Sequence, residues 1–515
     1  MDKDERKNVM IYLNGMDLSI EDVVAVAREG MQVAISQQAQ EQTNRTRAYV
    51  DKKVEEKAVI YGITTGFGKF SDTIISTDQT AQLQKNLIMS HACAMGEPLP
   101  KEVVRAAMLL RANSLSHGNS GIRLSTLLTL LEMLNKGVHP IIPRKGSLGA
   151  SGDLAPLSHM VLVMLGEGEA EYEGKILPGA EAMAKAGIPT VELAAKEGLC
   201  LINGTQIMTA IGCLVTYDAM KLTLVADVAA ALSSEALRGI QIAYDEKAHL
   251  LRPHAGQLTS AKNLRNLLSG SELSHRVRPD RVQDAYALRC VPQVHGASRD
   301  AINYVWNVLS TEINSVTDNP LIFPDADETI SCGHFHGQPV ALAMDFLGIA
   351  LSEYANISER RIERLVNPQL SGLPAFLTPE GGINSGFMIA QYAAASMVSE
   401  NKVYAHPASV DSIPSSANQE DHVSMGTTAA RKAMMILDNA QKVLSIELMT
   451  ASQALSFYDE SQMAPVTSAI LKTVRQAVAP SQKDIIMYKE MNKVFALVKE
   501  EKIWRSAKEA CAELQ

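Results

Sequence analysis

Residues 146–154, Gly-Ser-Leu-Gly-Ala-Ser-Gly-Asp-Leu, are a run of mostly small residues that can do unusual chemistry. Because glycine has no side chain, the backbone can fold sharply here, and the amide nitrogen of Gly152 can approach the carbonyl carbon of Ala150. Ring closure, with loss of water from the ring and from the Ser151 side chain, gives an exocyclic methylene conjugated to carbonyl groups. Such a group is a strong electrophile, whereas ordinary side chains are mainly nucleophiles and acids. Ala-Ser-Gly alone, however, is more often an ordinary turn between two helices.

The sequence around this tripeptide is much more specific than the tripeptide itself. The segment GSLGASGDLAPLSH resembles the signature of the aromatic amino acid ammonia-lyases and aminomutases. Other segments resemble blocks of the same family and follow in order: YGITTGFG (61–68), LINGTQ (201–206), VQDAYALRC (282–290), TDNPLIF (317–323), GHFHGQPVA (333–341) and SSANQEDHVSM (415–425). The chain is therefore identified as a member of this family, and it resembles most closely the members that act on histidine.

In that family the Ala-Ser-Gly tripeptide becomes 4-methylidene-imidazol-5-one (MIO). The resemblance implies that Ala150, Ser151 and Gly152 do the same here and that no external cofactor is needed. It also implies a carbon–nitrogen lyase that removes ammonia from L-histidine without oxidation and releases trans-urocanate. Such an elimination is difficult because the amine is a poor leaving group and the β-proton is only weakly acidic. An electrophile that binds the amine covalently addresses the first difficulty, and a positioned base addresses the second.

The resemblance assigns roles to several polar and aromatic residues. Tyr61 matches the catalytic tyrosine that takes the β-proton, and because a phenol ionises near pH ~10 in water, its site must favour the phenolate. Arg289 suits the substrate carboxylate, because a guanidinium pairs with it through two parallel hydrogen bonds. The other matches are Tyr286, a second catalytic position, and three substrate-binding positions, Asn203, Gln283 and Phe335, of which Asn203 and Phe335 are expected beside the MIO.

Two positions are expected to select the substrate. Glu420 resembles the histidine-specific version of its block, whereas relatives acting on phenylalanine or tyrosine carry glutamine there. A carboxylate can bind an imidazole N–H or act as a base, but a phenyl ring would leave it unpaired at a cost of about 1–3 kcal/mol. Ser90-His91 also resembles the histidine enzymes, so His91 is assigned to substrate binding. A phenylalanine or tyrosine ammonia-lyase or an aminomutase is the nearest alternative, and the sequence separates lyase from aminomutase poorly.

One block departs from the family pattern. The family commonly has Gly-Gly-Asn-Phe where this chain has Cys332-Gly333-His334-Phe335. A histidine beside the expected neighbour of the MIO can change hydrogen bonding or substrate fit. His334 and His336 form a His-x-His pair, but no carboxylate or cysteine cluster accompanies them, so we expect no metal site.

The elements that position these residues are expected to be mainly helical. Ala, Leu and Met are plentiful and aromatic residues make up only 5% of the chain, a balance that favours helix over strand. A run of about 30 residues makes a helix about 45 Å long. Long runs with few helix breakers occur at 205–237, 294–316, 338–366, 385–402 and 427–456. Shorter features are a strand at 9–13, a helix near 80–95, an amphipathic helix over 101–136, and loops at 277–293, 330–338, 369–386 and 405–426.

These runs predict a mainly α protein. We expect a long-helix bundle of the fumarase/aspartase-like kind, with a smaller N-terminal domain that carries loops and little strand. The predicted domains are 1–202, which contains the MIO-forming loop, and 203–515, the central and C-terminal helical bundle. A fumarase-type lyase without a built-in electrophile and an inactive helical scaffold are the other interpretations. The Ala-Ser-Gly loop argues against the first, and the full set of site residues argues against the second.

Composition limits the partners. The net charge of −9 is unremarkable for 515 residues and no basic stripe is visible, so nucleic acid is not expected. The six cysteines have no paired spacing, the N-terminus is charged where a secretory signal would be apolar, and no uncharged apolar stretch could span a bilayer. We expect a cytoplasmic protein with no membrane association that acts on a small amino acid. The family resemblance and the long apolar helices together predict a homotetramer with shared active sites.

Overall fold

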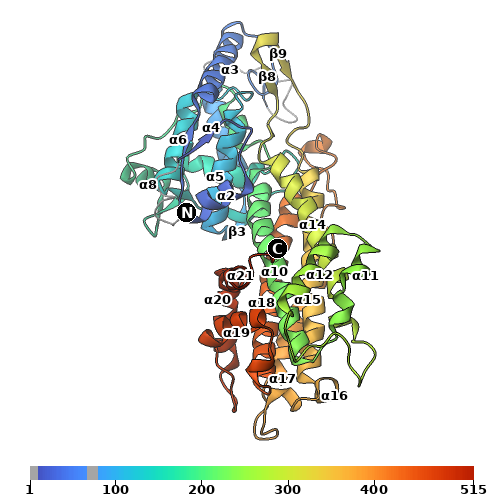
Figure 1. The fold of residues 1–515 in the computed structure, drawn as a ribbon. Helices are drawn as coiled ribbons and strands as arrows, with labels where there is room; N and C mark the ends of the chain where they lie inside the picture. Colours follow the sequence, from blue (N-terminus) through green and yellow to red (C-terminus); the bar gives the residue numbers. More distant parts are fainter. Residues whose placement is uncertain (1–9, 67–78) are drawn as a thin grey trace. The chain divides into compact units, whose positions relative to one another are not determined.

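The computed structural model describes residues 10–66 and 79–515 of the chain (Figure 1). Contacts along the backbone divide it into two compact units, each made of three segments. Unit 1 consists of Met1–Tyr217, Trp306–Asp345 and Pro407–Arg431, and unit 2 consists of Asp218–Val305, Phe346–His406 and Lys432–Gln515. The predicted domain boundary after residue 202 falls within the first segment of unit 1, and that domain division stays a prediction.

Every strand of the described residues lies in unit 1, and all of them are short. A parallel pair joins β1 (Met10–Leu13) to β2 (Gln32–Ile35), and antiparallel pairs join β3 (Met95–Pro98) to β5 (Pro143–Lys145) and β8 (Leu321–Phe323) to β9 (Glu328–Ile330). A three-stranded sheet has the order β4 (His139–Pro140), β6 (Glu169–Tyr172), β7 (Lys175–Pro178). The expected strand at 9–13 is present as β1, and its first expected residue, Val9, lies outside the described residues.

The helices of unit 1 surround a core built on α5 (Lys101–Ser116), in which every residue from Val103 to Ser116 is buried. The others are α2 (Ile20–Val24), α3 (Gln37–Glu55), α4 (Thr80–His91), α6 (Leu124–Lys136), α7 (Leu154–Met164), α8 (Gly179–Lys185), α9 (Glu197–Ile202) and the start of α10 (Gln206–Ala236).

The prediction of one amphipathic helix over 101–136 is wrong, because the chain turns between α5 and α6. Gly118 and Gly121 lie in this turn with φ of 75° and 78°, in the left-handed region. A Cβ atom at Gly118 would lie 2.4 Å from Cγ of Gln42, and one at Gly121 would lie 2.6 Å from Cγ2 of Val50. The turn therefore depends on close contact with α3, which the local helical pattern of 101–136 does not reveal.

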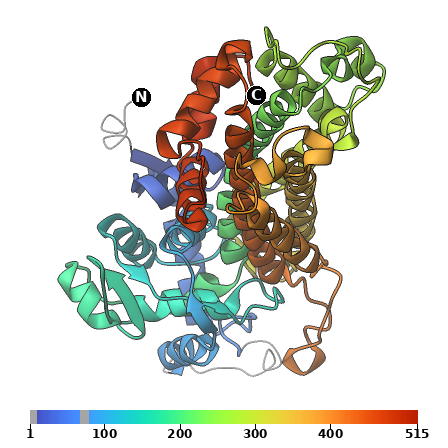
Figure 2. The same ribbon diagram turned by 90° about the horizontal axis from the view of Figure 1, so that it is seen from below.

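Unit 2 is entirely helical in its described regular structure. It contains α11 (Glu246–Leu250), α12 (Ala255–Leu267), α13 (Tyr286–Arg289), α16 (Pro368–Ser371), α17 (Met388–Tyr404), α19 (Pro465–Ala477), α20 (Met487–Lys499) and α21 (Lys502–Ala510). It also contains most of α10, α14 (Val291–Glu312), α15 (Gln338–Val366) and α18 (Gly426–Leu455) (Figures 1 and 2). The long helices expected near 205–237, 338–366 and 427–456 are confirmed, and so is the mainly α fold class.

Buried ion pairs hold the long helices of unit 2 together. Nη2 of Arg361 on α15 lies 2.8 Å from Oε2 of Glu447 on α18, and both side chains are fully buried. Oγ of Ser233 on α10 donates to the same carboxylate at 2.7 Å. Because a buried charge is costly unless it is paired and hydrogen-bonded, this network specifies which helices are neighbours.

Two helices of the described chain, α10 and α15, are long and apolar enough to cross a membrane by length and composition. However, 78% of the apolar window of α10 and 67% of that of α15 are buried within the protein. Both helices also carry buried charges with protein partners, Asp227 on α10 and Arg361 on α15. They are therefore core helices.

Candidate active site

The loop predicted to form the electrophile lies between β5 and α7 and is held on both sides by backbone contacts. Gly152 forms an isolated β-bridge with Gly204, and the amide of Asp153 donates to the Gly204 carbonyl at 2.7 Å. On the other side, the amide of Met425 donates to the Leu148 carbonyl at 2.8 Å. Gly152 has φ of 70°, and a Cβ atom there would lie 2.1 Å from the Gly204 carbonyl oxygen. Only glycine fits at this position.

Asp153 connects the end of the loop to the N-terminus of α10 through hydrogen bonds. Its Oδ2 accepts from the backbone amides of Ile207 and Met208 at 3.0 and 2.9 Å, where the helix dipole favours a negative charge. Its Oδ1 accepts from Oγ of Ser147 at 2.8 Å and from Oγ1 of Thr427. Burial raises the pKa of this carboxyl, and the same hydrogen bonds act in the opposite direction.

Ser151 contacts the predicted substrate-selecting carboxylate directly. Its Oγ donates to Oε1 of Glu420 at 3.0 Å, although 269 residues separate the two in sequence. Oε2 of Glu420 accepts from Oγ of Ser415 at 2.8 Å. The turn from Ser415 to Glu420 contains three consecutive non-glycine residues, 416–418, with φ of 50°, 55° and 68°. Such conformations cost on the order of 1–3 kcal/mol each and are typical of functional sites.

His91, at the end of α4, lies close enough to Glu420 for their charges to interact. Burial lowers the pKa of His91, while a hydrogen bond to the Leu87 carbonyl and the Glu420 carboxylate raise it by less. Burial therefore favours the neutral imidazole, which offers both an N–H donor and an acceptor. Of the predicted site residues, the structure joins Ser151 to Glu420 by a hydrogen bond, and it joins Gly152 to Gly204, the residue after Asn203.

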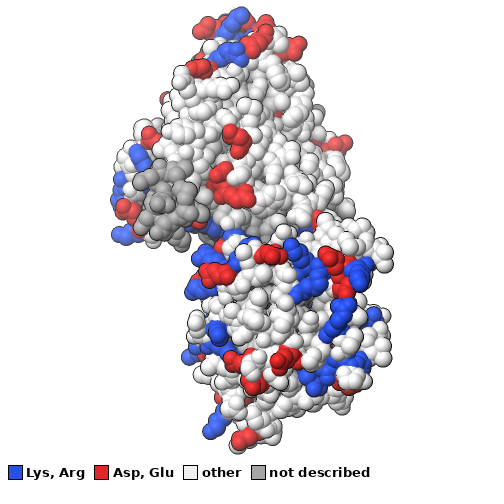
Figure 3. All heavy atoms as spheres, viewed as in Figure 1, with Lys and Arg blue, Asp and Glu red and all other residues white. Residues whose placement is uncertain are grey.

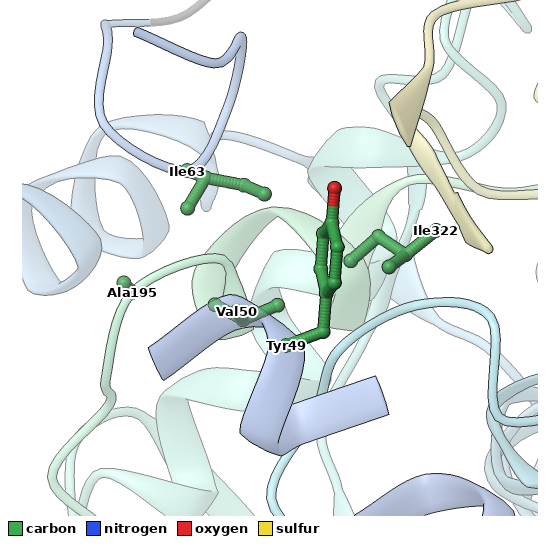
Figure 4. Close-up of a cluster of buried hydrophobic side chains, with 5 residues drawn as sticks. All are labelled: Tyr49, Val50, Ile63, Ala195 and Ile322. Carbon is green, nitrogen blue, oxygen red and sulfur yellow. The ribbon is translucent and has the colours of Figure 1, made fainter. Parts of the chain in front are cut away.

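Tyr61 lies in the turn that follows α3. Ile63, two residues further on, packs in a buried cluster with Tyr49, Val50, Ala195 and Ile322 (Figure 4). Tyr61 itself is half-buried and lines a pocket of about 390 Å³ with residues of α3 and of the β8–β9 hairpin, among them Lys53, Asp327 and Ser331. Phe67 and Gly68, the last residues of the YGITTGFG block, lie outside the described residues.

Phe335 is half-buried in the loop before α15, in the block that departs from the family pattern. Its neighbour His334 places Nδ1 3.0 Å from Sγ of Cys332, so the two unusual residues pair with each other. His336 stacks on His422 with ring centroids 5.7 Å apart. No group of three or more metal-ligating side chains occurs among the residues that the structure describes.

The three remaining predicted residues belong to unit 2. Tyr286 and Arg289 lie on the short helix α13, where the guanidinium carbon of Arg289 stands 4.6 Å from the centre of the Tyr286 ring. The Tyr286 side chain is 69% exposed, and Gln283 is also exposed. Arg289 is only partly exposed, and with the exposed Tyr286 it forms a surface that can complete a binding site.

The conformation of the loop gives a stability prediction. Gly149 has φ of 66°, and a Cβ atom there would lie 2.2 Å from the buried Oγ of Ser424. We expect Gly149→Ala to lower the free energy of unfolding by about 2–4 kcal/mol, from overpacking plus the left-handed backbone. Gly187→Ala is the matched control, because Gly187 has φ of 64° but no described atom within 4 Å of the added carbon. Chemical denaturation of both variants checks this, and equal losses would contradict it.

Comparison with known proteins matches this arrangement to a family. The model of the family described as aromatic amino acid lyase matches residues 18–476. The chain belongs to the aromatic amino acid lyase family. The histidine ammonia-lyase of Alkaliphilus metalliredigens is 63% identical to it, over 96% of this chain and 97% of that protein.

Solved structures of this lyase family share the fold. The histidine ammonia-lyase of Trypanosoma cruzi superimposes with a TM-score of 0.91 and 43% identity, covering 98% of this chain and 96% of the other. The tyrosine aminomutase of Streptomyces globisporus gives a TM-score of 0.93 with 35% identity, covering 97% and 99%. The family fold therefore accommodates different reactions, so side chains in the site must distinguish them.

Several residues that shape this lyase site do not stand out in the sequence. Asp153 lies within the loop block, but its role cannot be predicted from the block, because two of its partners are backbone amides some 50 residues away in sequence. Asp318 lies in the TDNPLIF block, whereas Lys196 lies outside the segments that resemble the family, yet the two form a fully buried ion pair. Buried charges of this kind are visible only once their surroundings are known.

Proposed function

We propose that this member of the aromatic amino acid lyase family is a histidine ammonia-lyase, which eliminates ammonia from L-histidine to give trans-urocanate. The observation that carries the proposal is the hydrogen bond between Ser151 and Glu420, a carboxylate whose charge also acts on His91. It joins the residue that would supply the electrophile to a carboxylate, and the carboxylate and the His91 imidazole can each bind a second imidazole. The high identity to proteins named histidine ammonia-lyase supports the same substrate.

We further propose that Ala150, Ser151 and Gly152 form the MIO. The loop fits this group, because Gly152 closes against Gly204 without room for a side chain, and Ala150 packs on Val423 and Met425. An MIO, once formed, supplies an electrophile for the substrate's amine. Asn203 has a buried side-chain oxygen without a partner among the described residues, which leaves one acceptor available beside the loop.

Other side chains would bind the substrate and transfer its protons. Glu420 would bind an imidazole N–H of the substrate or take a proton from it, and His91 would offer the ring a donor or an acceptor. A phenyl ring would leave both groups unsatisfied, which disfavours phenylalanine. Tyr61 would remove the β-proton, and Arg289 would bind the carboxylate.

The proposed enzyme is a homotetramer whose active sites combine residues of different subunits. Tyr286 and Gln283 are exposed, and Arg289 is only partly covered, as expected for residues that complete a neighbour's site. α17 is apolar over much of its length, but only Ala390, Ala394 and Asn401 are buried in it. Figure 3 shows a broad surface of unit 1 with few charged side chains, which also suits subunit contact. The six cysteines are free, which supports a reducing, cytoplasmic location.

The direct experiment is to mix the purified enzyme with L-histidine, L-phenylalanine or L-tyrosine. Ultraviolet absorbance detects the unsaturated acid products, and chromatography detects a β-amino acid. Urocanate from histidine alone is the expected result. Cinnamate, coumarate or a β-amino acid as the main product would reject the proposal in favour of a different lyase or an aminomutase.

The shared site can be tested by mixing two inactive variants. Ser151→Ala removes the electrophile and Arg289→Ala removes the carboxylate partner, so each homotetramer is expected to be nearly inactive. If Arg289 serves a neighbouring subunit, random hybrid tetramers contain about a quarter of sites with both residues intact. Activity of co-expressed, co-purified chains is therefore expected at about a quarter of the wild-type level.

Two features make this mixing experiment decisive. A Ser151→Ala/Arg289→Ala double variant mixed with wild-type chains gives the same number of altered residues and serves as the control for assembly. A site formed within one chain predicts no recovery at all in the hybrids. Hybrid activity at the level of the two parents would therefore reject the shared site.

A further inference from the structure

Lys196 and Asp318 form a buried ion pair that the proposed reaction does not use. Nζ of Lys196 lies 2.7 Å from Oδ2 of Asp318, and both side chains are fully buried. Lys196 immediately precedes α9, with φ of 74°, and Asp318 precedes β8. Desolvation makes a buried ion pair a weak source of stability, so the question is which other groups this pair contacts.

The second oxygen of Asp318 holds the side chain of Asn203. Nδ2 of Asn203 lies 3.2 Å from Oδ1 of Asp318 and 3.2 Å from the carbonyl oxygen of Asn319. Both partners can only accept hydrogen bonds, so the nitrogen of the Asn203 amide must face them. The backbone amide of Asn319 also donates to Oδ1 of Asp318 at 2.7 Å, which keeps that oxygen in place.

This arrangement determines which end of the Asn203 amide remains available. Asn203 is 3% exposed, and its Oδ1 has no hydrogen-bond partner among the residues that the structure describes. Its backbone carbonyl accepts from Nη1 of Arg111 at 2.7 Å, so the main chain is held as well. Other buried side-chain atoms of the described residues also have no partner, but Asn203 directly precedes Gly204, which bridges to Gly152 of the Ser151 loop. A ligand bound at that loop can therefore donate to the Asn203 oxygen.

We infer that Asp318, paired with Lys196, is a positioning residue that keeps the oxygen of Asn203 free to accept a hydrogen bond from the substrate's amino group. The inference rests on the proposed function, because it requires an amino acid bound beside the Ser151 loop. It assigns Asn203 to the amino group of the substrate and not to its carboxylate, which would need a donor.

Asp318→Asn is expected to release the Asn203 amide from its present orientation. The new amide has one oxygen, and the Lys196 ammonium attracts it, because hydrogen bonds from charged donors are the stronger ones. Its NH₂ group then faces the Asn203 nitrogen, and two donors repel. Asn203 then either turns its oxygen toward residue 318, where that oxygen also meets the Asn319 carbonyl, or loses its hydrogen bond to residue 318. In both cases its oxygen is no longer held in place for the substrate.

The test measures binding in the Ser151→Ala background, where no MIO can form and activity plays no part. Calorimetry compares L-histidine with 3-(imidazol-4-yl)propanoate, which has the same ring and carboxylate but no amino group. Adding Asp318→Asn is expected to weaken histidine binding by about 10- to 100-fold, the scale of a hydrogen bond to a charged group. Binding of the analogue is expected to change by less than about threefold, since it makes no such bond.

Two further variants separate positioning from folding. Glu447→Gln is the matched control, because it also replaces a fully buried carboxylate in an ion pair but lies in unit 2. It is expected to lower stability and leave both affinities unchanged. Lys196→Met/Asp318→Asn removes the ammonium, so the new amide can keep its oxygen toward Asn203 and the Asn319 amide. This double variant is expected to regain histidine affinity to within about threefold of the Ser151→Ala parent.

Each outcome bears on the inference. Equal weakening of both ligands by Asp318→Asn, or weakening of neither, would overturn it. If Asp318→Asn does not fold, the inference is tested with the double variant alone, because that variant leaves no charge unpaired. A folded double variant whose histidine affinity is still reduced tenfold or more would also overturn the inference. Failure of the Ser151→Ala parent to bind histidine would reject the proposed substrate instead, and phenylalanine and 3-phenylpropanoate would then replace the histidine pair.

Discussion

Ser151→Ala is expected to abolish ammonia elimination while the protein stays folded. Ser151 would supply the methylene carbon of the MIO, and alanine has no hydroxyl to lose. Removal of the reacting group of a covalent catalyst lowers turnover by a factor on the order of 10³ or more. The hydrogen bond from Ser151 to Glu420 exists only before the MIO forms, because MIO formation consumes the Ser151 hydroxyl. Alanine also fits the loop sterically, so the free energy of unfolding should change little.

Three measurements on this variant separate chemistry from folding: urocanate formation, near-ultraviolet absorbance of the MIO, and the urea midpoint of unfolding. Ser158→Ala is a matched control, because Ser158 lies on the next helix and its Oγ donates to the Leu154 carbonyl of the same helix at 2.7 Å. It should keep the absorbance and the activity. A Ser151→Ala enzyme that turns over at nearly the wild-type rate would exclude an electrophile made from this loop.

Glu420→Gln is expected to cut histidine turnover by orders of magnitude. If Glu420 binds the imidazole or acts as a base, the loss of general-base catalysis alone amounts to about 10²–10⁴-fold. Glutamine has nearly the same shape and can still accept from Oγ of Ser415, so the strained turn of residues 415–420 should survive. The absorbance of the MIO should therefore persist.

The same variant tests substrate choice. The substitution removes the negative charge that disfavours an apolar ring, so weak turnover of phenylalanine or tyrosine is compatible with the hypothesis. It is not required, because His91 still shapes the pocket. Asp421→Asn is the matched control, because it makes the same change of charge at the next residue, where the side chain is exposed. Steady-state kinetics with all three amino acids measure both effects. Normal deamination of histidine by Glu420→Gln would remove the argument for histidine and leave the electrophile unaffected.

The sequence alone was sufficient wherever the determining interactions are local. The Ala-Ser-Gly tripeptide and the glycines around it are consecutive, and the left-handed φ of Gly149 and Gly152 is a conformation that glycine adopts freely. The long helices could also be predicted, because a run of helix-forming residues without breakers determines its own conformation over many turns.

Contacts between distant residues are not visible in local patterns. The segment HGNSG (117–121) between α5 and α6 is itself a turn signal, but the sequence does not show that Gly118 and Gly121 accommodate Gln42 and Val50 of α3. Likewise, the carboxylate of Glu420 could be assigned to substrate selection from its block. Its contact with Ser151, 269 residues away, follows from the turn that Ser415 stabilises.

The ion pair of Lys196 and Asp318 could not be predicted from the sequence. The two residues are 122 positions apart, and each is an ordinary charged residue when the chain is read in order. A charge that becomes buried must find an opposite charge or donors, but the sequence does not specify which of the many ionisable residues will be its partner. The packing of α9 beside the segment before β8 brings Lys196 and Asp318 together. The same packing determines the orientation of the Asn203 amide.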